Sequence, residues 1–173
     1  LDIAKIKSDK LILRLAMADV GKLITDSVAN VQSQAGDKKI SLSSVFPPEM
    51  PPVMTDAFRL KQVIRNLLDN SLKFTPQYGT IRIEVQKVQG GIRVNVKDSG
   101  IGISRENLKR VFEPFFQIDS SYSRKYRGTG LGLTICKGII DRHGGKIWVE
   151  SDGEGRGSTF SFTLPIKNKN IIY

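Results

Sequence analysis

The chain carries the segment Asp98-Ser99-Gly100-Ile101-Gly102-Ile103 directly after a stretch of alternating apolar residues, and a second glycine segment, Gly128-Thr129-Gly130-Leu131-Gly132-Leu133, about 30 residues later. Upstream of both lies Asn66-Leu67-Leu68-Asp69-Asn70-Ser71-Leu72-Lys73. The glycine segments supply a carboxylate and backbone that another molecule can approach closely. The upstream segment adds two amides and an ammonium at helical spacing. Together these groups are an inventory for binding a nucleotide.

The hydrophobic pattern around these segments predicts a mixture of helices and strands. Helices are expected over 19–36, 56–74, 104–111 and 131–142, and strands over 11–15, 40–46, 81–85, 92–96, 146–150 and 158–164. Asp19, Asp56 and Ser104 are the expected N-caps, the prolines within 47–52 predict an extended connection, and Gly90-Gly91 predicts a hairpin turn. The fold class is therefore α+β, a two-layer α/β sandwich in which a mixed, mainly antiparallel sheet packs on three helices.

Composition narrows the classes of function. The 173 residues carry a net charge of +10 and include one cysteine, Cys136, and one histidine, His143. These numbers exclude a disulfide, a thiolate cluster and a histidine-pair metal motif. No apolar run approaches the roughly 20 residues of a membrane span. The basic charge favours an anionic partner such as a nucleotide, nucleic acid, acidic protein or membrane surface, or else describes a solvated basic surface.

Asn66, Asn70 and Lys73 share one face of the predicted helix because they lie four and three residues apart. An amide oxygen is a suitable ligand for Mg²⁺, which takes few protein ligands, and the lysine can meet phosphate as a point charge. The alternative is an ordinary amphipathic helix with a polar outer face. Two asparagines inside a helix lower its propensity, which weakens that alternative.

Asp98 ends a predicted strand on the same side as its apolar residues. A carboxylate in apolar surroundings needs a hydrogen-bond donor, and an adenine amino group would supply one. The alternative is a turn in which Asp98 bonds its own backbone. A dinucleotide-binding motif fits poorly because Arg105 stands where the third glycine is required.

The second glycine segment opens a predicted helix, where free backbone amides bind phosphate with the help of the helix dipole. The alternative is glycine for close packing of the helix on the sheet. A P-loop is excluded because no Lys-Ser or Lys-Thr pair follows the glycines. Arg124, Lys125 and Arg127 precede them in a long loop, 112–129, and are expected either to close over phosphates or to be a solvated basic loop.

Three further features have structural readings. Phe112-Glu113-Pro114-Phe115-Phe116 begins the long loop as a core plug or as a hinge or docking surface. His143, before Gly144-Gly145, is read as a helix C-terminal cap, and Cys136 as core packing.

The order of these segments resembles that of the catalytic ATP-binding domain of sensor histidine kinases, within the superfamily that includes gyrase, Hsp90-type chaperones and MutL mismatch-repair proteins. The asparagine helix, the Asp-x-Gly-x-Gly segment, the Phe-rich box and the Gly-x-Gly-x-Gly segment occur in that order. The resemblance covers roughly residues 11–165, and the turn Gly155-Arg156-Gly157-Ser158-Thr159-Phe160 matches a further C-terminal box.

The resemblance implies ATP and Mg²⁺ as ligands. Asn70 would hold Mg²⁺ with Asn66 beside it, and residues 113–129 would form a mobile ATP lid. Lys73 would meet phosphate, and Asp98 would read the adenine. The implied catalytic residues are Asn66, Asn70 and Lys73. The implied nucleotide contacts are Asn66, Asn70, Lys73, Asp98, Gly100, Gly102, Ile103, Phe112, Arg124, Lys125, Arg127, Gly128, Thr129, Gly130, Leu131, Gly132, Leu133 and Thr159.

The implied activity is that of a protein-histidine kinase. The ATPase members of the superfamily carry a general-base glutamate one helical turn before the metal-binding asparagine, and here that position is Asn66. This favours transfer of the γ-phosphate to a histidine upstream of Leu1, with no autophosphorylation by the fragment alone. The alternative is an ATPase module of the chaperone or gyrase type, and a third interpretation is a binding module, nucleotide-free or nucleic-acid-binding, that kept the fold.

The same resemblance divides the chain into the end of an upstream dimerisation helix or linker (1–10), the catalytic domain (11–167) and a C-terminal tail (168–173). Expected partners are ATP or ADP, the dimerisation and phosphoacceptor domain of the same protein and the receiver domain of a response regulator, but no nucleic acid. We expect a homodimeric parent, a monomeric fragment and a cytoplasmic location, and whether the parent is anchored in a membrane stays open.

Overall fold

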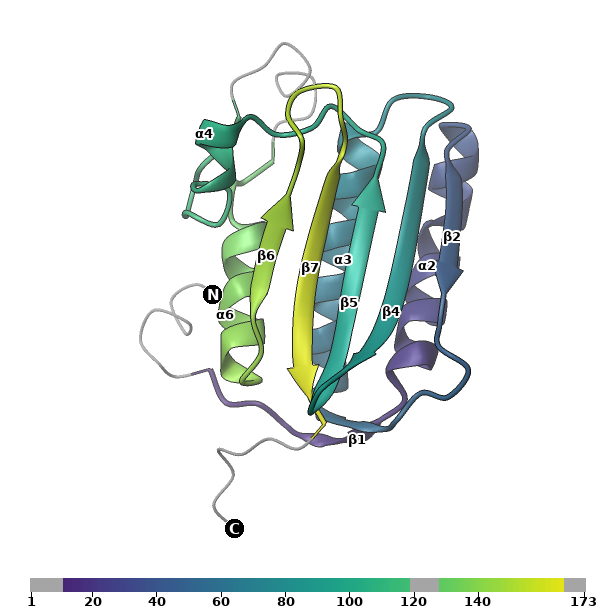
Figure 1. The fold of residues 1–173 in the computed structure, drawn as a ribbon, viewed down its shortest axis with the longest axis vertical. Helices are drawn as coiled ribbons and strands as arrows, with labels where there is room; N and C mark the ends of the chain where they lie inside the picture. The colour runs from purple at the N-terminus through teal and green to yellow at the C-terminus, as the bar shows by residue number, and fades with distance from the viewer. Residues whose placement is uncertain (1–10, 119–127, 167–173) are drawn as a thin grey trace.

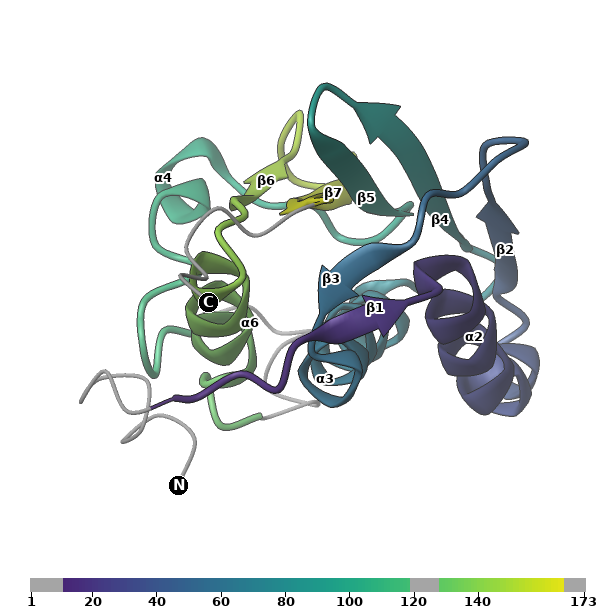
Figure 2. The same cartoon turned by 90° about the horizontal axis from the view of Figure 1, so that it is seen from below.

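The computed structural model describes residues 11–118 and 128–166 as two layers. A five-stranded sheet has the order β2 (Ser41–Val45), β4 (Thr80–Val88), β5 (Gly91–Asp98), β7 (Ser158–Pro165) and β6 (Ile147–Glu150). Three helices, α2 (Val20–Asp37), α3 (Ala57–Phe74) and α6 (Gly132–Arg142), lie side by side on one face of this sheet (Figures 1 and 2). The predicted α+β sandwich is confirmed.

The sheet is mixed, as expected, because one of its pairings is parallel. β2 and β4 run parallel, and the pairs β4–β5, β5–β7 and β6–β7 are antiparallel. Parallel neighbours need a crossover, and here the chain passes through α3 between β2 and β4. The β4–β5 hairpin turns at Gln89 and Gly90, so Gly91 already pairs with Val88 as the first residue of β5.

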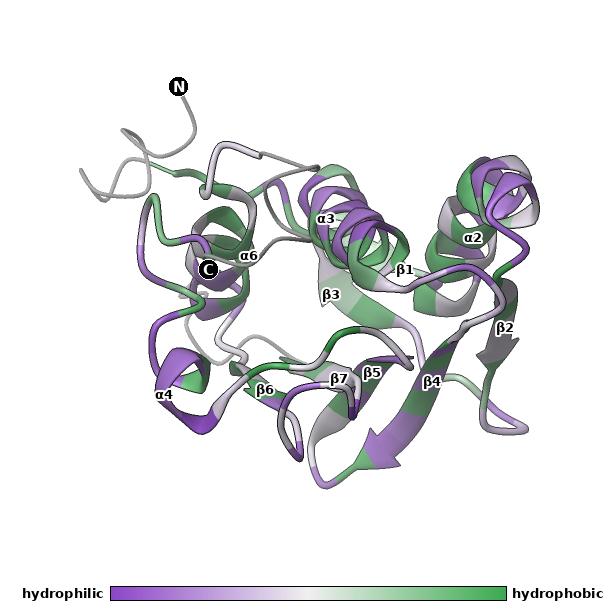
Figure 3. Cartoon of the chain, turned by 90° about the horizontal axis from the view of Figure 1, so that it is seen from above, coloured by the Kyte–Doolittle hydropathy of each residue, from purple (hydrophilic) through white to green (hydrophobic). Residues whose placement is uncertain are grey.

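The core lies between the sheet and the helices. Along β4 the residues at every second position are buried, which appears as bands of green and purple in Figure 3. Strand alternation directs these side chains to the helix layer. The sheet contributes Ile81, Ile83, Val94, Val96, Phe160 and Phe162, and α3 contributes Leu60, Ile64, Leu67 and Leu68, all at most 6% exposed.

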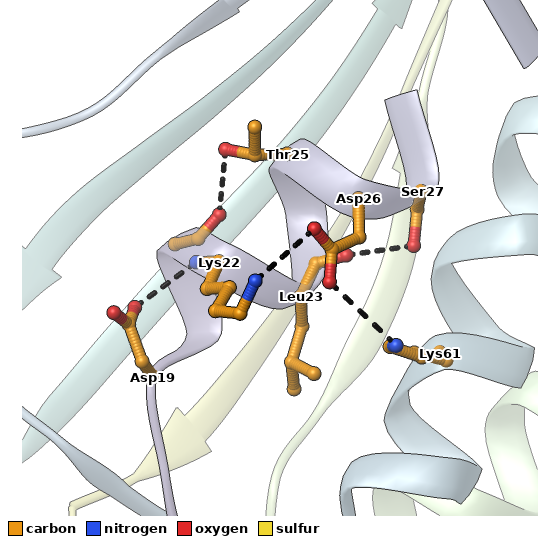
Figure 4. A network of polar contacts seen from close by, with 8 residues as sticks. Asp19, Lys22, Leu23, Thr25, Asp26, Ser27 and Lys61 are labelled. Carbon is orange, nitrogen blue, oxygen red and sulfur yellow. Dashed lines mark hydrogen bonds and ion pairs between the residues drawn. The ribbon is translucent and has the colours of Figure 1, made fainter. Parts of the chain in front are cut away.

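The three predicted N-caps are confirmed. Asp19 accepts a hydrogen bond from the backbone of Lys22, and Asp56 accepts one from the backbone of Arg59. Ser104 caps α4 (Arg105–Leu108), which ends before the expected Val111. On the solvent side of α2, Asp26 lies 3.5 Å from Lys22 and 3.8 Å from Lys61 of α3 (Figure 4). Exposed pairs of this kind contribute little, so the buried face holds α2 in place.

The strand expected over residues 11–15 is wrong. These residues form no strand, and β1 (Ala16–Ala18) follows them, paired antiparallel with β3 (Val53–Thr55). The backbone N–H of Arg14 donates to the Asp56 carboxylate at 2.8 Å instead of to a ladder. The sequence does not predict β3, because the prolines within 47–52 indicate an extended connection without a strand partner. This two-stranded ribbon crosses the end of the molecule where α3 begins (Figure 2).

His143 is the predicted C-cap of α6 and also joins two helices. Its ring is buried, Nε2 accepts the backbone N–H of Asp56 at 3.0 Å, and Nδ1 donates to the carbonyl of Ile139 at 2.8 Å. These two contacts require the neutral ring with the proton on Nδ1. The end of α6 is thereby attached to the start of α3.

We expect the His143 contacts to make stability pH-dependent. Burial lowers the pKa of His143 below its ordinary value of 6.5, against the opposing effects of the Ile139 carbonyl and the Asp56 carboxylate. The stabilisation is therefore complete above that ordinary value and is lost as the pH falls from it toward the lowered pKa. The free energy of unfolding, measured by urea titration between about pH 7.5 and about pH 5.5, should fall more steeply in the wild type than in His143→Asn. Equal slopes would contradict this role.

Candidate functional site

A pocket is lined by residues from the ends of β5 and α3 and from the beginning of α6. The ends of β5 and α3 lie toward the upper end of Figure 1. It encloses about 260 Å³. The predicted site residues that line it are Asn70, Lys73, Asp98, Gly102, Ile103, Gly128, Thr129, Gly130, Gly132 and Leu133. Segments that are far apart in the chain, such as those around Asn70, Asp98 and Gly130, are thus brought to one cavity, as the nucleotide-site hypothesis requires.

Asp98 is the charged group at one end of the pocket. It is 6% exposed, and each carboxylate oxygen accepts a hydrogen bond: Oδ2 from the Ser158 hydroxyl at 2.7 Å and Oδ1 from the Gly100 N–H at 2.8 Å. Burial raises the pKa of Asp98, while the hydrogen bonds from Ser158 and Gly100 oppose that rise. A carboxylate oxygen can accept more than one hydrogen bond, so both retain capacity for a ligand donor.

Gly100 does not line the pocket, but close packing around its backbone requires a glycine at this position. A Cβ at this position would lie 2.6 Å from Asp98 Oδ1 and 2.7 Å from the carbonyl oxygen of Phe74, too close for any side chain. The last turn of α3 therefore lies directly against the segment that follows β5, and Ile101 N–H donates to the same Phe74 carbonyl at 3.1 Å. This contact sets the distance between the helix end and the carboxylate.

The polar face of α3 reaches the pocket through Asn70 and Lys73. The Lys73 ammonium would be 3.3 Å from a Cβ on Gly128, so it lies against the second glycine segment. Burial lowers the pKa of Lys73. Asn66 does not line the cavity, because its amide nitrogen donates to the carbonyl of Gly132 at 3.3 Å. Asn66 thus attaches α3 to the first turn of α6.

The second glycine segment leads into α6, with Leu131 at the N-cap. Leu131 makes no side-chain capping hydrogen bond, so within the described part of the chain the N-cap leaves the first-turn amides of α6 without a side-chain partner. The segment is attached to the preceding loop, where Phe115 N–H donates to the Gly130 carbonyl at 2.9 Å and Gln117 Nε2 donates to that of Gly128 at 2.5 Å. A bare helix N-terminus beside an ammonium is a suitable environment for phosphate.

Arg124, Lys125 and Arg127 lie outside the described residues, as does the middle of the expected lid. Phe112 does not line the pocket and supports the core, with its ring edge-on to Phe160 at 6.3 Å. Of its box, Phe116 lines the pocket and Phe115 is 69% exposed. The box therefore divides between core packing, the pocket wall and the surface.

The expectation for Thr159 is corrected by strand register. Ser158 pairs with Asp98 on the helix-facing side of the sheet, whereas Thr159 pairs with the exposed Lys97 on the other side. The structure places Ser158, and not Thr159, in the pocket. From the sequence, the C-terminal box locates the pocket-facing hydroxyl only to within one residue, at Ser158 or Thr159. The pairing of Ser158 with Asp98 decides that it is Ser158.

Other lining residues were not predicted. They are Ser71, Phe74, Ile101, Val111, Phe116, Gln117, Ile118 and Phe160. Most are apolar and form walls for a flat ligand, and their sequence signal is the same as that of ordinary core residues. Among the described residues no three His, Cys, Asp or Glu side chains come together as a metal cluster. The Asn70 amide, which lines the pocket, is a neutral oxygen donor of a type that Mg²⁺ accepts.

Comparison with known families agrees with this geometry. Residues 55–168 match the family described as "Histidine kinase-, DNA gyrase B-, and HSP90-like ATPase". The chain is 38% identical over 174 residues to the "Non-motile and phage-resistance protein" of Caulobacter vibrioides, covering 98% of the chain and 20% of the relative. It is 41% identical over 119 residues to the "Sensor histidine kinase WalK" of Bacillus subtilis, covering 68% of the chain and 19% of the relative. The chain thus spans about a fifth of these relatives.

The solved structures that this chain resembles include those of histidine kinases. The catalytic domain of histidine kinase ThkA superposes with a TM-score of 0.78 at 32% identity, covering 89% of this chain and 97% of that one. Full-length ShkA in complex with AMPPNP superposes with a TM-score of 0.86 at 27% identity, covering 96% of this chain and 34% of that one. ThkA in complex with the response regulator protein TrrA superposes with a TM-score of 0.79 at 28% identity, covering 98% of this chain and 48% of that one. No described helix is sufficiently long and apolar to span a membrane.

Asp98→Asn should weaken ATP binding by about one to two orders of magnitude, because the new amide N–H₂ would face the adenine amino group and leave buried donors unpaired. Calorimetric titration of the purified chain with ATP measures this. Asp69→Asn, on the same helix as Asn70 and exposed, is the matched control and should bind as the wild type does. Equal affinity of Asp98→Asn and wild type would remove the adenine assignment.

Ser158→Ala should shift the pH dependence of ADP affinity. The Ser158 hydroxyl lowers the pKa of Asp98, so its loss raises that pKa further and protonates the carboxylate at a higher pH. ADP affinity, which needs the ionised acceptor, should then decline at a higher pH than in the wild type. Thr159→Ala, on the opposite face of β7, should leave the pH profile unchanged. Identical profiles for Ser158→Ala and wild type would show that the hydroxyl does not tune Asp98.

Proposed function

The chain belongs to the family of histidine kinase-, DNA gyrase B- and HSP90-like ATPases as a catalytic ATP-binding domain of the sensor histidine kinase type, and from this premise we propose that it donates the terminal phosphate of ATP to a histidine elsewhere in its parent protein. In that step a ring nitrogen of the acceptor forms a bond to the γ-phosphorus, the bond to the bridging oxygen breaks, and ADP leaves. The pocket's residues bind and orient the nucleotide for this transfer.

The single observation that carries the proposal is the position of Asn66. Where an ATPase of this superfamily would hold a general-base glutamate, this chain has an amide that is bonded to the Gly132 carbonyl. Asp98 is the only carboxylate among the described residues that line the pocket. No described side chain in the lining other than Asp98 is a carboxylate that could serve as the general base for a water molecule.

The chain's own residues divide the work of binding. Asp98 accepts from the adenine amino group, with its geometry held by Ser158 and Gly100. Lys73 and the first-turn amides of α6 take the phosphate charge. Asn70 would hold Mg²⁺, which when bound with ATP neutralises charge on the phosphate oxygens. The AMPPNP complex of the structural relative ShkA supports an ATP-type ligand.

His143 is unsuited as the phosphate acceptor. It is the only histidine in the sequence, it is 1% exposed, and both ring nitrogens are engaged. Its contacts attach α6 to α3, so a phosphate on either nitrogen would break them. We therefore place the acceptor histidine outside these 173 residues, on a dimerisation and phosphoacceptor domain of the same protein.

The remaining partners follow from the same proposal. A phosphorylated histidine would pass its phosphate to the receiver domain of a response regulator, and the ThkA–TrrA complex supports a partner of this kind. The parent would act as a homodimer with this domain in the cytoplasm, where ATP is available. Nucleic acid is not proposed as a partner, because the basic residues are spread along the chain rather than gathered with aromatic residues.

The proposal is tested with labelled ATP. The parent protein should acquire phosphate that is stable to alkali and labile to acid, as a phosphohistidine is, whereas this chain alone should acquire none. Asn70→Ala in the parent should remove both labelling and Mg²⁺-dependent ATP binding. Steady phosphate release by the isolated chain that disappears in Asn66→Ala would instead favour the ATPase alternative.

A further inference from the structure

One residue of the pocket has a polar side chain where the packing pattern calls for an apolar one. The buried residues of α3 are Leu60, Val63, Ile64, Leu67, Leu68, Ser71 and Leu72. Ser71 is the polar member of this stripe and is 2% exposed. It stands in the last turns of α3, where the sheet-facing stripe leaves the core and meets the pocket, which it lines. Packing alone does not account for a hydroxyl at this point.

The Ser71 hydroxyl has no hydrogen-bond partner among the described residues, although it is buried. A serine inside a helix ordinarily donates to the carbonyl four residues earlier. In α2, Ser27 donates in this way to Leu23 at 2.7 Å and Thr25 to Gly21 at 2.9 Å (Figure 4). A buried hydroxyl that forgoes this bond retains its full cost of desolvation. A ligand in the pocket would remove that cost by accepting or donating a hydrogen bond.

Ser71 belongs to the adenine end of the pocket by its neighbours in the chain. Three residues later, the carbonyl of Phe74 lies against Gly100 and the Asp98 carboxylate. Residues three apart on a helix share a face, so Ser71 and Phe74 approach the cavity from the same side. Of the other described hydroxyls that line the pocket, Ser158 already donates to Asp98, and Thr129 lies in the second glycine segment.

We propose that the Ser71 hydroxyl is a second reader of the adenine base, acting beside Asp98 either directly or through one bound water. The inference rests on the proposed function, since it assumes an adenine nucleotide in this pocket. The amino edge of adenine presents a donor next to ring nitrogens that accept. An ionised carboxylate can satisfy only the donor, and a hydroxyl can donate to a ring nitrogen. Ser71 and Asp98 together match both the amino donor and an acceptor ring nitrogen of adenine.

The test compares Ser71→Ala with Ser27→Ala in the whole chain, using ADP as the probe. Ala is a strong helix former, so both variants should fold. Ser71→Ala should raise the Kd for ADP, measured by calorimetry, by about three- to tenfold, the loss expected for one hydrogen bond. Its ligand-free Tm should stay the same or rise, because the hydroxyl that it removes is unsatisfied without ligand.

Ser27→Ala removes a buried hydroxyl that already has a partner and lies on α2, outside the pocket lining. It should lower the ligand-free Tm slightly and leave the Kd for ADP unchanged. An unaltered Kd in Ser71→Ala would overturn the inference, and so would a weaker Kd accompanied by a lower ligand-free Tm, which would assign Ser71 a packing role. Failure of the wild-type chain to bind ADP at all would instead overturn the proposed function, so the two failures are distinct.

Discussion

The rest of the site depends on the contact between the last turn of α3 and the Asp98 carboxylate at the end of β5. No side chain fits at Gly100, which separates the Phe74 carbonyl from Asp98 Oδ1. A helix on one layer and a strand on the other are therefore held at backbone distance, and the cavity opens beside this contact. The buried carboxylate is kept available as an acceptor by two donors, Ser158 and Gly100, against the cost of burying its charge.

The opposite ends of the helices show how this contact is maintained. Near its start, α3 is attached to the end of α6 by the His143 ring, which accepts from the backbone of Asp56. Farther along, Asn66 attaches α3 to the beginning of α6. The two helices are thus joined at two levels, so the glycine segment that precedes α6 is positioned relative to Lys73 and Asn70. Pocket-lining residues on separate elements lie together because these buried polar contacts hold the elements at defined distances.

Much of this arrangement was predictable from local patterns. The caps at Asp19, Asp56 and Ser104, the helix over 57–74 and the hairpin of β4 and β5 follow from residue types that act within a few positions. The wrong predictions concern segments whose secondary structure depends on a residue that is distant in the sequence. Residues 11–15 alternate as a strand would, but the Asp56 carboxylate takes the Arg14 N–H. The strand β3 exists because β1 pairs with it, and no local signal outweighs the prolines that precede it.

The sequence by itself determined which chemical groups the site contains, because the order of the asparagine helix and the two glycine segments is enough to indicate an ATP pocket and the family. It also placed an amide, Asn66, at the position where the ATPases of the superfamily carry a general-base glutamate. Only the tertiary structure decided which side chains near these segments face the pocket. Strand register selected Ser158 over Thr159, and the bond to Gly132 drew Asn66 away from the cavity. The end of the α3 stripe left the Ser71 hydroxyl without a hydrogen-bond partner among the residues that the structure describes. Each of these depends on what a side chain meets across the layers, which residue order alone does not specify.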